Sequence, residues 1–167
     1  ATVESLGYQN YTYRDLKVNG TMKNQFFSGH AILQDKNLDF KLDADLNYTD
    51  TIPTYKVMLN LNTIDFNALH LSERPLKARA TFEANLATTD FRSMNGNMAI
   101  RKVAVYNGEA LYKVDSLIFA TLDQEGKSEL SIQSDILEGT FKGTFNLIDM
   151  PKTLKQHINQ YYVLSDS

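Results

Sequence analysis

Between Leu38 and Tyr48 every second residue is apolar, and every residue in between is polar. Because successive side chains of a β-strand point to opposite faces, this alternation predicts a strand with one apolar and one polar face. The same period recurs along most of the chain. It predicts nine strands, over residues 11–21, 26–34, 38–49, 54–62, 76–88, 97–106, 110–122, 128–136 and 139–147.

Short polar breaks separate these apolar runs, as at residues 35–37 and 124–127. Breaks of this length are typical of hairpin loops, so neighbouring strands in the sequence are expected to be antiparallel neighbours in space. The chain has 167 residues, of which 43% are hydrophobic and 22% charged, as in one folded domain. The expectation is a mainly β, long, antiparallel, curved and one-sided sheet forming a single module over residues 1–167.

Two segments depart from the period of two. Ile64, Ala68 and Leu71 are spaced i, i+4, i+7, which predicts a short internal helix over residues 63–71. Asp149 and Pro151 form a helix start signal, which predicts a C-terminal amphipathic helix reaching residue 164.

Composition argues against several classes of function. The net charge is −3 and no run of Lys and Arg is longer than two, so no nucleic-acid footprint is expected. Cysteine is absent, which excludes disulfides and thiolate zinc sites. The three histidines, His30, His70 and His157, lack the spacing of a metal site. No cofactor or metal is expected.

Catalytic constellations are also missing from the sequence. Neither a Gly-x-Ser-x-Gly elbow nor a phosphate-binding glycine loop occurs, so the chain is not expected to be an enzyme. Asp39, Asp43 and Asp45 share one strand face at spacings that a carbohydrate hydrolase could use. The same spacing arises on any solvated strand face, and that interpretation is favoured.

Function depends on what covers the apolar face of such a sheet. The sheet could close into a barrel that holds one small apolar ligand. A second layer could pack on it, or lipid or another module could lie against it from outside. The two predicted helices are too short to cover so long a face.

Several segments together resemble the AsmA-like and TamB (translocation and assembly module) family of Gram-negative envelopes, in its Bacteroidetes form. One resembles the family's phenylalanine and glycine strand that leads through Asp-x-Asn-Leu into an alternating strand, and another its strand that runs into an Asp-x-x-x-Leu turn. The segments that carry the resemblance are residues 16–20, 27–40, 59–69, 85–91, 95–97, 134–135, 139–143 and 161–162.

The resemblance implies a fragment of a longer periplasmic protein, tethered to the inner membrane through a segment outside this chain. It implies a taco-like trough lined with apolar side chains, which takes part in phospholipid transport between the two membranes and in outer-membrane protein assembly. The implied partners are phospholipid acyl chains, neighbouring modules of the same chain and an outer-membrane barrel protein. The family's terminal domain that meets this barrel is not recognisable here.

The alternation and the resemblance agree on an apolar lining without catalytic residues. The candidate lining residues are Leu38, Phe40, Leu42, Leu46, Tyr48, Val57, Leu59, Leu61, Phe82, Leu86, Leu130, Ile132, Ile136, Phe141 and Phe145. The alternative is that these side chains form a closed core.

Overall fold

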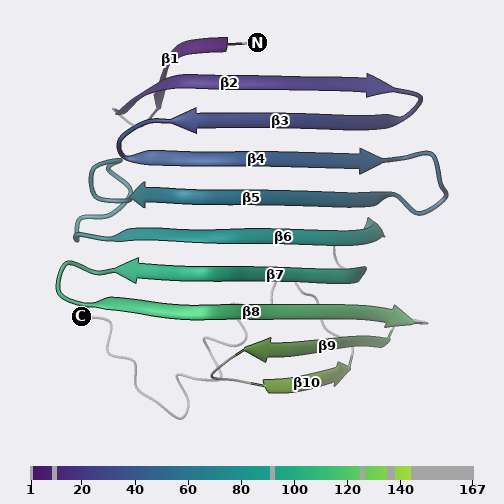
Figure 1. Cartoon of the computed structure of the whole chain (residues 1–167). Helices are drawn as coiled ribbons and strands as arrows, with labels where there is room; N and C mark the ends of the chain where they lie inside the picture. The colour runs from purple at the N-terminus through teal and green to yellow at the C-terminus, as the bar shows by residue number, and fades with distance from the viewer. Residues whose placement is uncertain (1, 9–10, 91–92, 125–126, 135–137, 144–167) are drawn as a thin grey trace.

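The computed structural model describes residues 2–8, 11–90, 93–124, 127–134 and 138–143, and these form a single antiparallel sheet (Figure 1). The strands are β1 (Thr2–Tyr8), β2 (Tyr11–Lys23), β3 (Phe26–Gln34), β4 (Leu38–Asn47), β5 (Thr54–Asp65), β6 (Lys77–Asp90), β7 (Ser93–Tyr106), β8 (Leu111–Gln124), β9 (Lys127–Ser134) and β10 (Glu138–Gly143).

Each strand pairs with the next one along the chain, so the order in space is the order in sequence. In Figure 1, β1 and β10 lie at opposite edges of an open, uncurled sheet. The prediction of a mainly β, long, antiparallel, one-sided sheet is therefore confirmed. The alternative of a closed barrel is wrong for the described strands, because β1 and β10 do not pair.

A strand is present at each of the nine predicted positions, and where both ends are described they differ from the predicted ends by a few residues. Residues 135–136 and 144–147 of the last two predicted strands lie outside the described residues. The sequence analysis missed β1, which lacks a regular alternation of apolar residues. A two-residue connection joins β2 to β3 through Asn24 and Gln25, whose φ angles are +48° and +62°. Two positive φ angles are the mark of a type I′ turn, whose twist matches that of the paired strands.

The predicted internal helix over residues 63–71 is wrong. Its first three residues belong to β5, where Ile64 pairs with Leu38 on one side and Ala78 on the other. Only one helical turn follows, and both of its ends are capped. The Asp65 carboxylate accepts the Ala68 backbone N–H at 3.0 Å, which is the hydrogen bond of an N-cap.

The turn ends at His70, which has a left-handed φ of +61°. The His70 N–H donates to the Asn67 carbonyl at 3.0 Å, and the Leu71 N–H donates to the Phe66 carbonyl at 2.8 Å. These two bonds form a Schellman motif, which terminates helices. The helical spacing in the sequence does correspond to a helical turn. The Asp65 N-cap and the Schellman motif at His70 lie too close together in the chain for a second turn to form.

The N-cap carboxylate makes the stability of this turn depend on pH. The Ala68 N–H, and after it the Lys77 ammonium 2.9 Å away, hold the pKa of Asp65 below its usual value against the opposing effect of burial. A lowered pKa in the folded state means that the ionised carboxylate stabilises the fold. This contribution is complete above the ordinary aspartate pKa of about 4 and is lost as the pH falls through the lower folded value.

We expect Asp65→Asn to lower the free energy of unfolding by about 1 kcal/mol at pH 7, since an amide still caps the turn but no longer pairs with Lys77. The difference between the two proteins should vanish in strong acid. Urea unfolding at several pH values measures it. A difference that stays constant from pH 7 into strong acid would contradict the assignment.

The described residues form one layer. Extensive contacts join only adjacent strands, and neither a helix nor a second sheet covers either face of the described part. The predicted C-terminal helix over residues 149–164 lies outside the described residues. Nowhere in the described ranges is there a helix long and apolar enough to span a bilayer.

Candidate functional site

The strand register aligns apolar side chains into three rows that cross the sheet on one side, which we call the apolar face. In a sheet, residues directly opposite one another on adjacent strands lie on the same face. The first row is Met22, Phe27, Leu46, Tyr55, Leu86, Gly96, Thr121, Leu130 and Phe141; the second is Gly20, Gly29, Ala44, Val57, Ala84, Met98, Phe119, Ile132 and Gly139; the third is Val18, Ala31, Leu42, Leu59, Phe82, Ile100 and Leu117.

Glycines interrupt the second row at β2 and β3, and an aromatic ring fills the space that they leave. A methyl group on Gly29 would lie 2.7 Å from the Phe27 ring, and one on Gly20 would lie 3.2 Å from the same ring. Phe27 therefore covers both glycines, as aromatic residues do when they shield glycine backbone in a sheet. The apolar surface is thus continuous across this break.

Most of the predicted lining residues lie on this one face. Phe40 and Leu61 pair with each other and extend this face toward one strand end. Leu38 lies two residues before Phe40 and so has the same face by alternation.

The exposure of these lining residues differs along the face. Leu130 and Ile132 are buried, at 1% and 5% exposure, whereas Phe141 is 43% exposed. Tyr48 lies just beyond β4, with its ring 5.9 Å from that of Tyr55 in an edge-on contact. Ile136 and Phe145 lie outside the described residues.

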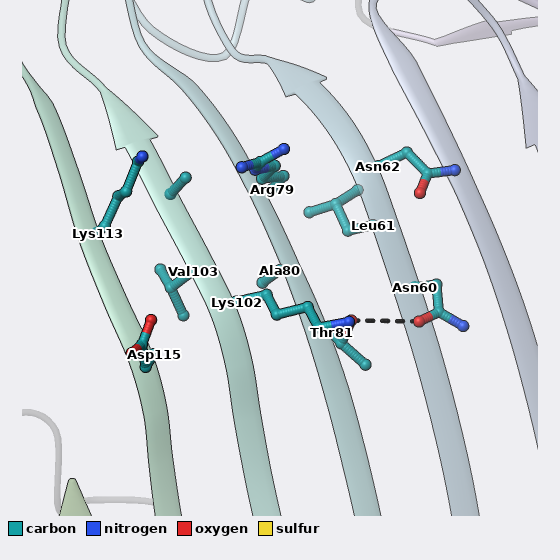
Figure 2. A pocket seen from close by; sticks show the side chains of 11 residues that line it. Asn60, Leu61, Asn62, Arg79, Ala80, Thr81, Lys102, Val103, Lys113 and Asp115 are labelled. Atoms are coloured by element: carbon teal, nitrogen blue, oxygen red, sulfur yellow. Dashed lines mark hydrogen bonds between the residues drawn. The ribbon is translucent and has the colours of Figure 1, made fainter. Parts of the chain in front are cut away.

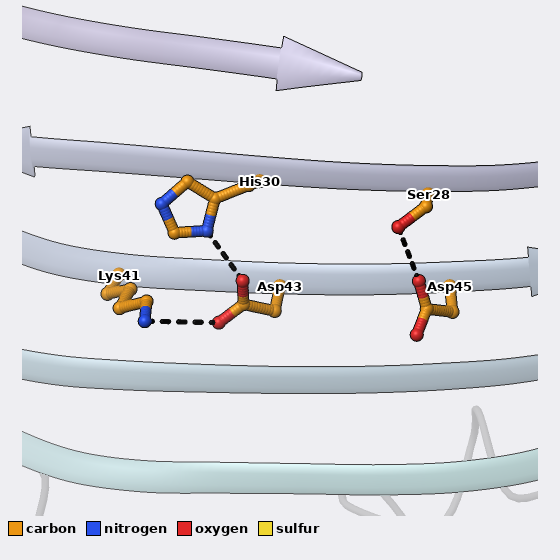
Figure 3. A network of polar contacts seen from close by, with 5 residues as sticks. All are labelled: Ser28, His30, Lys41, Asp43 and Asp45. Carbon is orange, nitrogen blue, oxygen red and sulfur yellow. Dashed lines mark hydrogen bonds and ion pairs between the residues drawn. The ribbon is translucent and has the colours of Figure 1, made fainter. Parts of the chain in front are cut away.

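The opposite side, which we call the polar face, carries the aspartates considered as a catalytic group. His30 Nδ1 lies 2.5 Å from Asp43 Oδ1, and Lys41 Nζ lies 3.8 Å from the other oxygen of that carboxylate (Figure 3). The Ser28 hydroxyl donates to Asp45 at 2.7 Å. Each contact joins β3 to β4 or lies within β4, so the cluster ties neighbouring strands together.

This cluster has the geometry of a solvated strand face. The Asp43 side chain is 44% exposed, and the Asp39 carboxylate accepts a hydrogen bond from the Asn62 amide at 2.8 Å. The aspartates follow one strand and do not converge on a reacting centre, as paired catalytic carboxylates must. Among the described residues, no three His, Asp or Glu side chains are placed to hold a metal ion.

A separate hollow of about 660 Å³ lies over β5 to β8 (Figure 2). Asn60 pairs with Thr81, and Ala104 pairs with both Arg79 and Lys113, so these residues share a face. Asn60, Arg79 and Thr81 alternate along their strands with Leu61 and Ala80, so they belong to the polar face, and Leu61, Ala80 and Val103 line the hollow as well. The polar side chains around the hollow are Asn60, Asn62, Arg79, Thr81, Lys102, Lys113 and Asp115.

The sequence analysis did not find this hollow. Between the pairs Thr81↔Arg101 and Arg79↔Ala104, β6 advances two residues and β7 three, so β7 has a bulge. Lys102 lies in this bulge with a left-handed φ of +53°. A bulge changes the direction in which side chains leave the strand. The pairing register of β6, β7 and β8 then brings Arg79, Lys102 and Lys113 to the same hollow from three strands. The sequence does contain one signal for this arrangement. The pair Asn107-Gly108 indicates a turn between β7 and β8, and that turn sets the register in which Ala104 lies opposite Lys113.

Comparison with protein-family models, with curated proteins and with solved structures finds no match to this chain.

Proposed function

We propose that this protein is a non-enzymatic module whose apolar sheet face receives the acyl chains of phospholipids. The observation that carries the proposal is the set of three apolar rows on one side of a sheet whose described part is open and a single layer. Apolar patches larger than a few hundred Å² are rare on monomeric soluble proteins and mark sites of interaction. The resemblance to TamB and AsmA-like proteins supports the same function.

The dimensions of the face suit an acyl chain. From β3 to β8 each row crosses five strand spacings of about 4.8 Å, which is roughly 24 Å. One leaflet of a bilayer core is about 15 Å thick, so an extended acyl chain fits along a row. Each CH₂ group that moves from water onto such a surface contributes about 0.8 kcal/mol. The apolar gain therefore grows with the length of chain in contact and requires no specific polar contact.

The proposed setting follows from the resemblance. We place the module in the periplasm, in a longer protein held to the inner membrane by a segment outside this chain. There it takes part in moving phospholipid toward the outer membrane and in outer-membrane protein assembly. Neighbouring modules of the same chain and a barrel protein of the outer membrane are the proposed partners. An open sheet allows lipid to pass from strand to strand, which a closed cavity does not.

Two adjacent residues of β5 test the proposal. Leu59 lies between Leu42 and Phe82 on the apolar face, whereas Met58 lies between Asp43 and Glu83 on the polar face. We expect Leu59→Lys to reduce crosslinking to a diazirine-labelled phospholipid at least tenfold, because it puts an unpaired charge under the acyl chain. Met58→Lys adds the same charge beside two carboxylates and should leave the crosslinking unchanged.

A second apolar-face variant, Leu42→Asp, should behave as Leu59→Lys does. Circular dichroism shows whether each variant keeps its strands. Crosslinking that persists in both folded variants, or that labels the polar face of the unaltered protein, would contradict the proposal. So would an unaltered protein that captures no phospholipid, as expected if another protein layer covers this face.

A further inference from the structure

The hollow on the polar face is surrounded by cations that the fold itself does not neutralise. Arg79, Lys102 and Lys113 are exposed, and none of the three forms an ion pair within the described ranges. Other cations of this sheet do have partners: Lys77 pairs with Asp65 at 2.9 Å, and Lys142 with Glu129 at 3.0 Å. The charges around the hollow are therefore available to a ligand.

The three cations come from different strands and surround one space. Arg79 and Lys113 lie on β6 and β8, directly opposite each other across Ala104 of β7. The small Ala104 side chain, which is buried at 6% exposure, leaves the space between them open. In Figure 2 the Lys102 side chain extends from β7 toward the pair formed by Thr81 and Asn60, whose hydrogen bond is 3.2 Å long.

Charge and hydrogen-bonding capacity specify the kind of ligand. Among the described residues that line the hollow, Asp115 carries the one negative charge. Together with the three cations it gives the lining a net charge of two positive units. A phosphate monoester carries close to two negative charges at neutral pH. Arginine binds phosphate through two parallel N–H donors, while lysine acts as a point charge. The amides of Asn60 and Asn62 offer donors and acceptors to a polar carrier of that phosphate.

We propose that this hollow binds a phosphate monoester carried on a small, hydroxyl-bearing molecule, with Arg79, Lys102 and Lys113 around the phosphate. A volume of about 660 Å³ exceeds what one phosphate group fills, and it leaves room for a carrier of sugar size. The ligand is a soluble one. A phospholipid headgroup offers the same phosphate chemistry, and the vesicle assay below distinguishes the two sources.

The test is titration of the full chain with glucose 6-phosphate, followed by NMR or calorimetry. We expect saturable binding that weakens with added salt, and no binding of glucose, since the cations recognise the phosphate. The double variant Arg79→Gln with Lys113→Gln should lower the affinity at least tenfold, and Lys102→Gln alone should lower it severalfold. Inorganic phosphate should compete for the site.

Lys56 provides the matched control. It is an exposed cation of β5 on the polar face, outside the hollow, and it forms no ion pair among the described residues. Lys56→Gln removes the same charge and should leave the affinity unchanged. Equal losses in Lys56→Gln and in the double variant would overturn the proposal, because the attraction would then be a general effect of charge.

A vesicle assay separates the two sources of phosphate. Binding to vesicles made of equal parts phosphatidylcholine and phosphatidic acid, without binding of glucose 6-phosphate, would overturn the assignment of a soluble ligand. Binding of glucose 6-phosphate without loss in the double variant would overturn the assignment of the site. Neither result involves Leu59 or Leu42, so the capture of acyl chains is tested separately by the variants at those two residues.

Discussion

Gly96→Ala is expected to lower the free energy of unfolding by about 3 kcal/mol or more. Gly96 lies in β7 between Leu86 and Thr121, with a φ of +140° that residues with a side chain rarely adopt. A methyl group at this position would lie 2.0 Å from the backbone carbonyl oxygen of Asn85. That oxygen belongs to the backbone of β6 and cannot move without disrupting the pairing of β6 with β7.

Urea denaturation followed by circular dichroism measures this loss. Gly139→Ala is the control, because the nearest atom to its added methyl group is a Phe141 ring carbon at an ordinary 3.7 Å. The control should change stability by no more than about 0.5 kcal/mol. If the two variants were equally stable, the close approach of β6 to Gly96 would not exist in solution.

The strands were predictable because one-sided burial imposes a period of two on the sequence. Between Phe40 and Leu46 each apolar residue occupies the face that the alternation assigned to it, and its partners on β3 and β5 are apolar residues or glycine. The edge strand β1 was not predicted, since Val3, Leu6 and Tyr8 do not fall on every second position. The other edge strand, β10, does alternate and was predicted, so the alternation itself decides which strands can be found.

The sequence wrongly predicted the internal helix and did not predict the hollow, for different reasons. The spacing of Ile64, Ala68 and Leu71 fits a helix, but the pairing of Ile64 with Leu38 and Ala78 competes for the same residue. The hollow depends on register and on the left-handed bulge at Lys102, which bring together residues distant in the chain. Periodicity within one segment contains no information about either.

Leu69→Ala is expected to cost about 3 kcal/mol of unfolding free energy, although Leu69 lies outside every strand. Its side chain is fully buried, at 0% exposure, in the capped turn between β5 and β6. Truncating a buried leucine removes apolar contacts and leaves a cavity that a turn fixed by two caps cannot fill by relaxing. The expected cost is therefore that of a core residue.

Leu71, two residues later, provides the comparison. It is 45% exposed, so Leu71→Ala should cost less than about 1 kcal/mol when measured by urea unfolding. The sheet has no second layer in its described part, so a leucine buried in a connection anchors that connection to the strands. Equal costs for the two variants would mean that the turn is not anchored through Leu69. A larger cost at Leu69 would mean that the link from β5 to β6 depends on this side chain as well as on its hydrogen bonds.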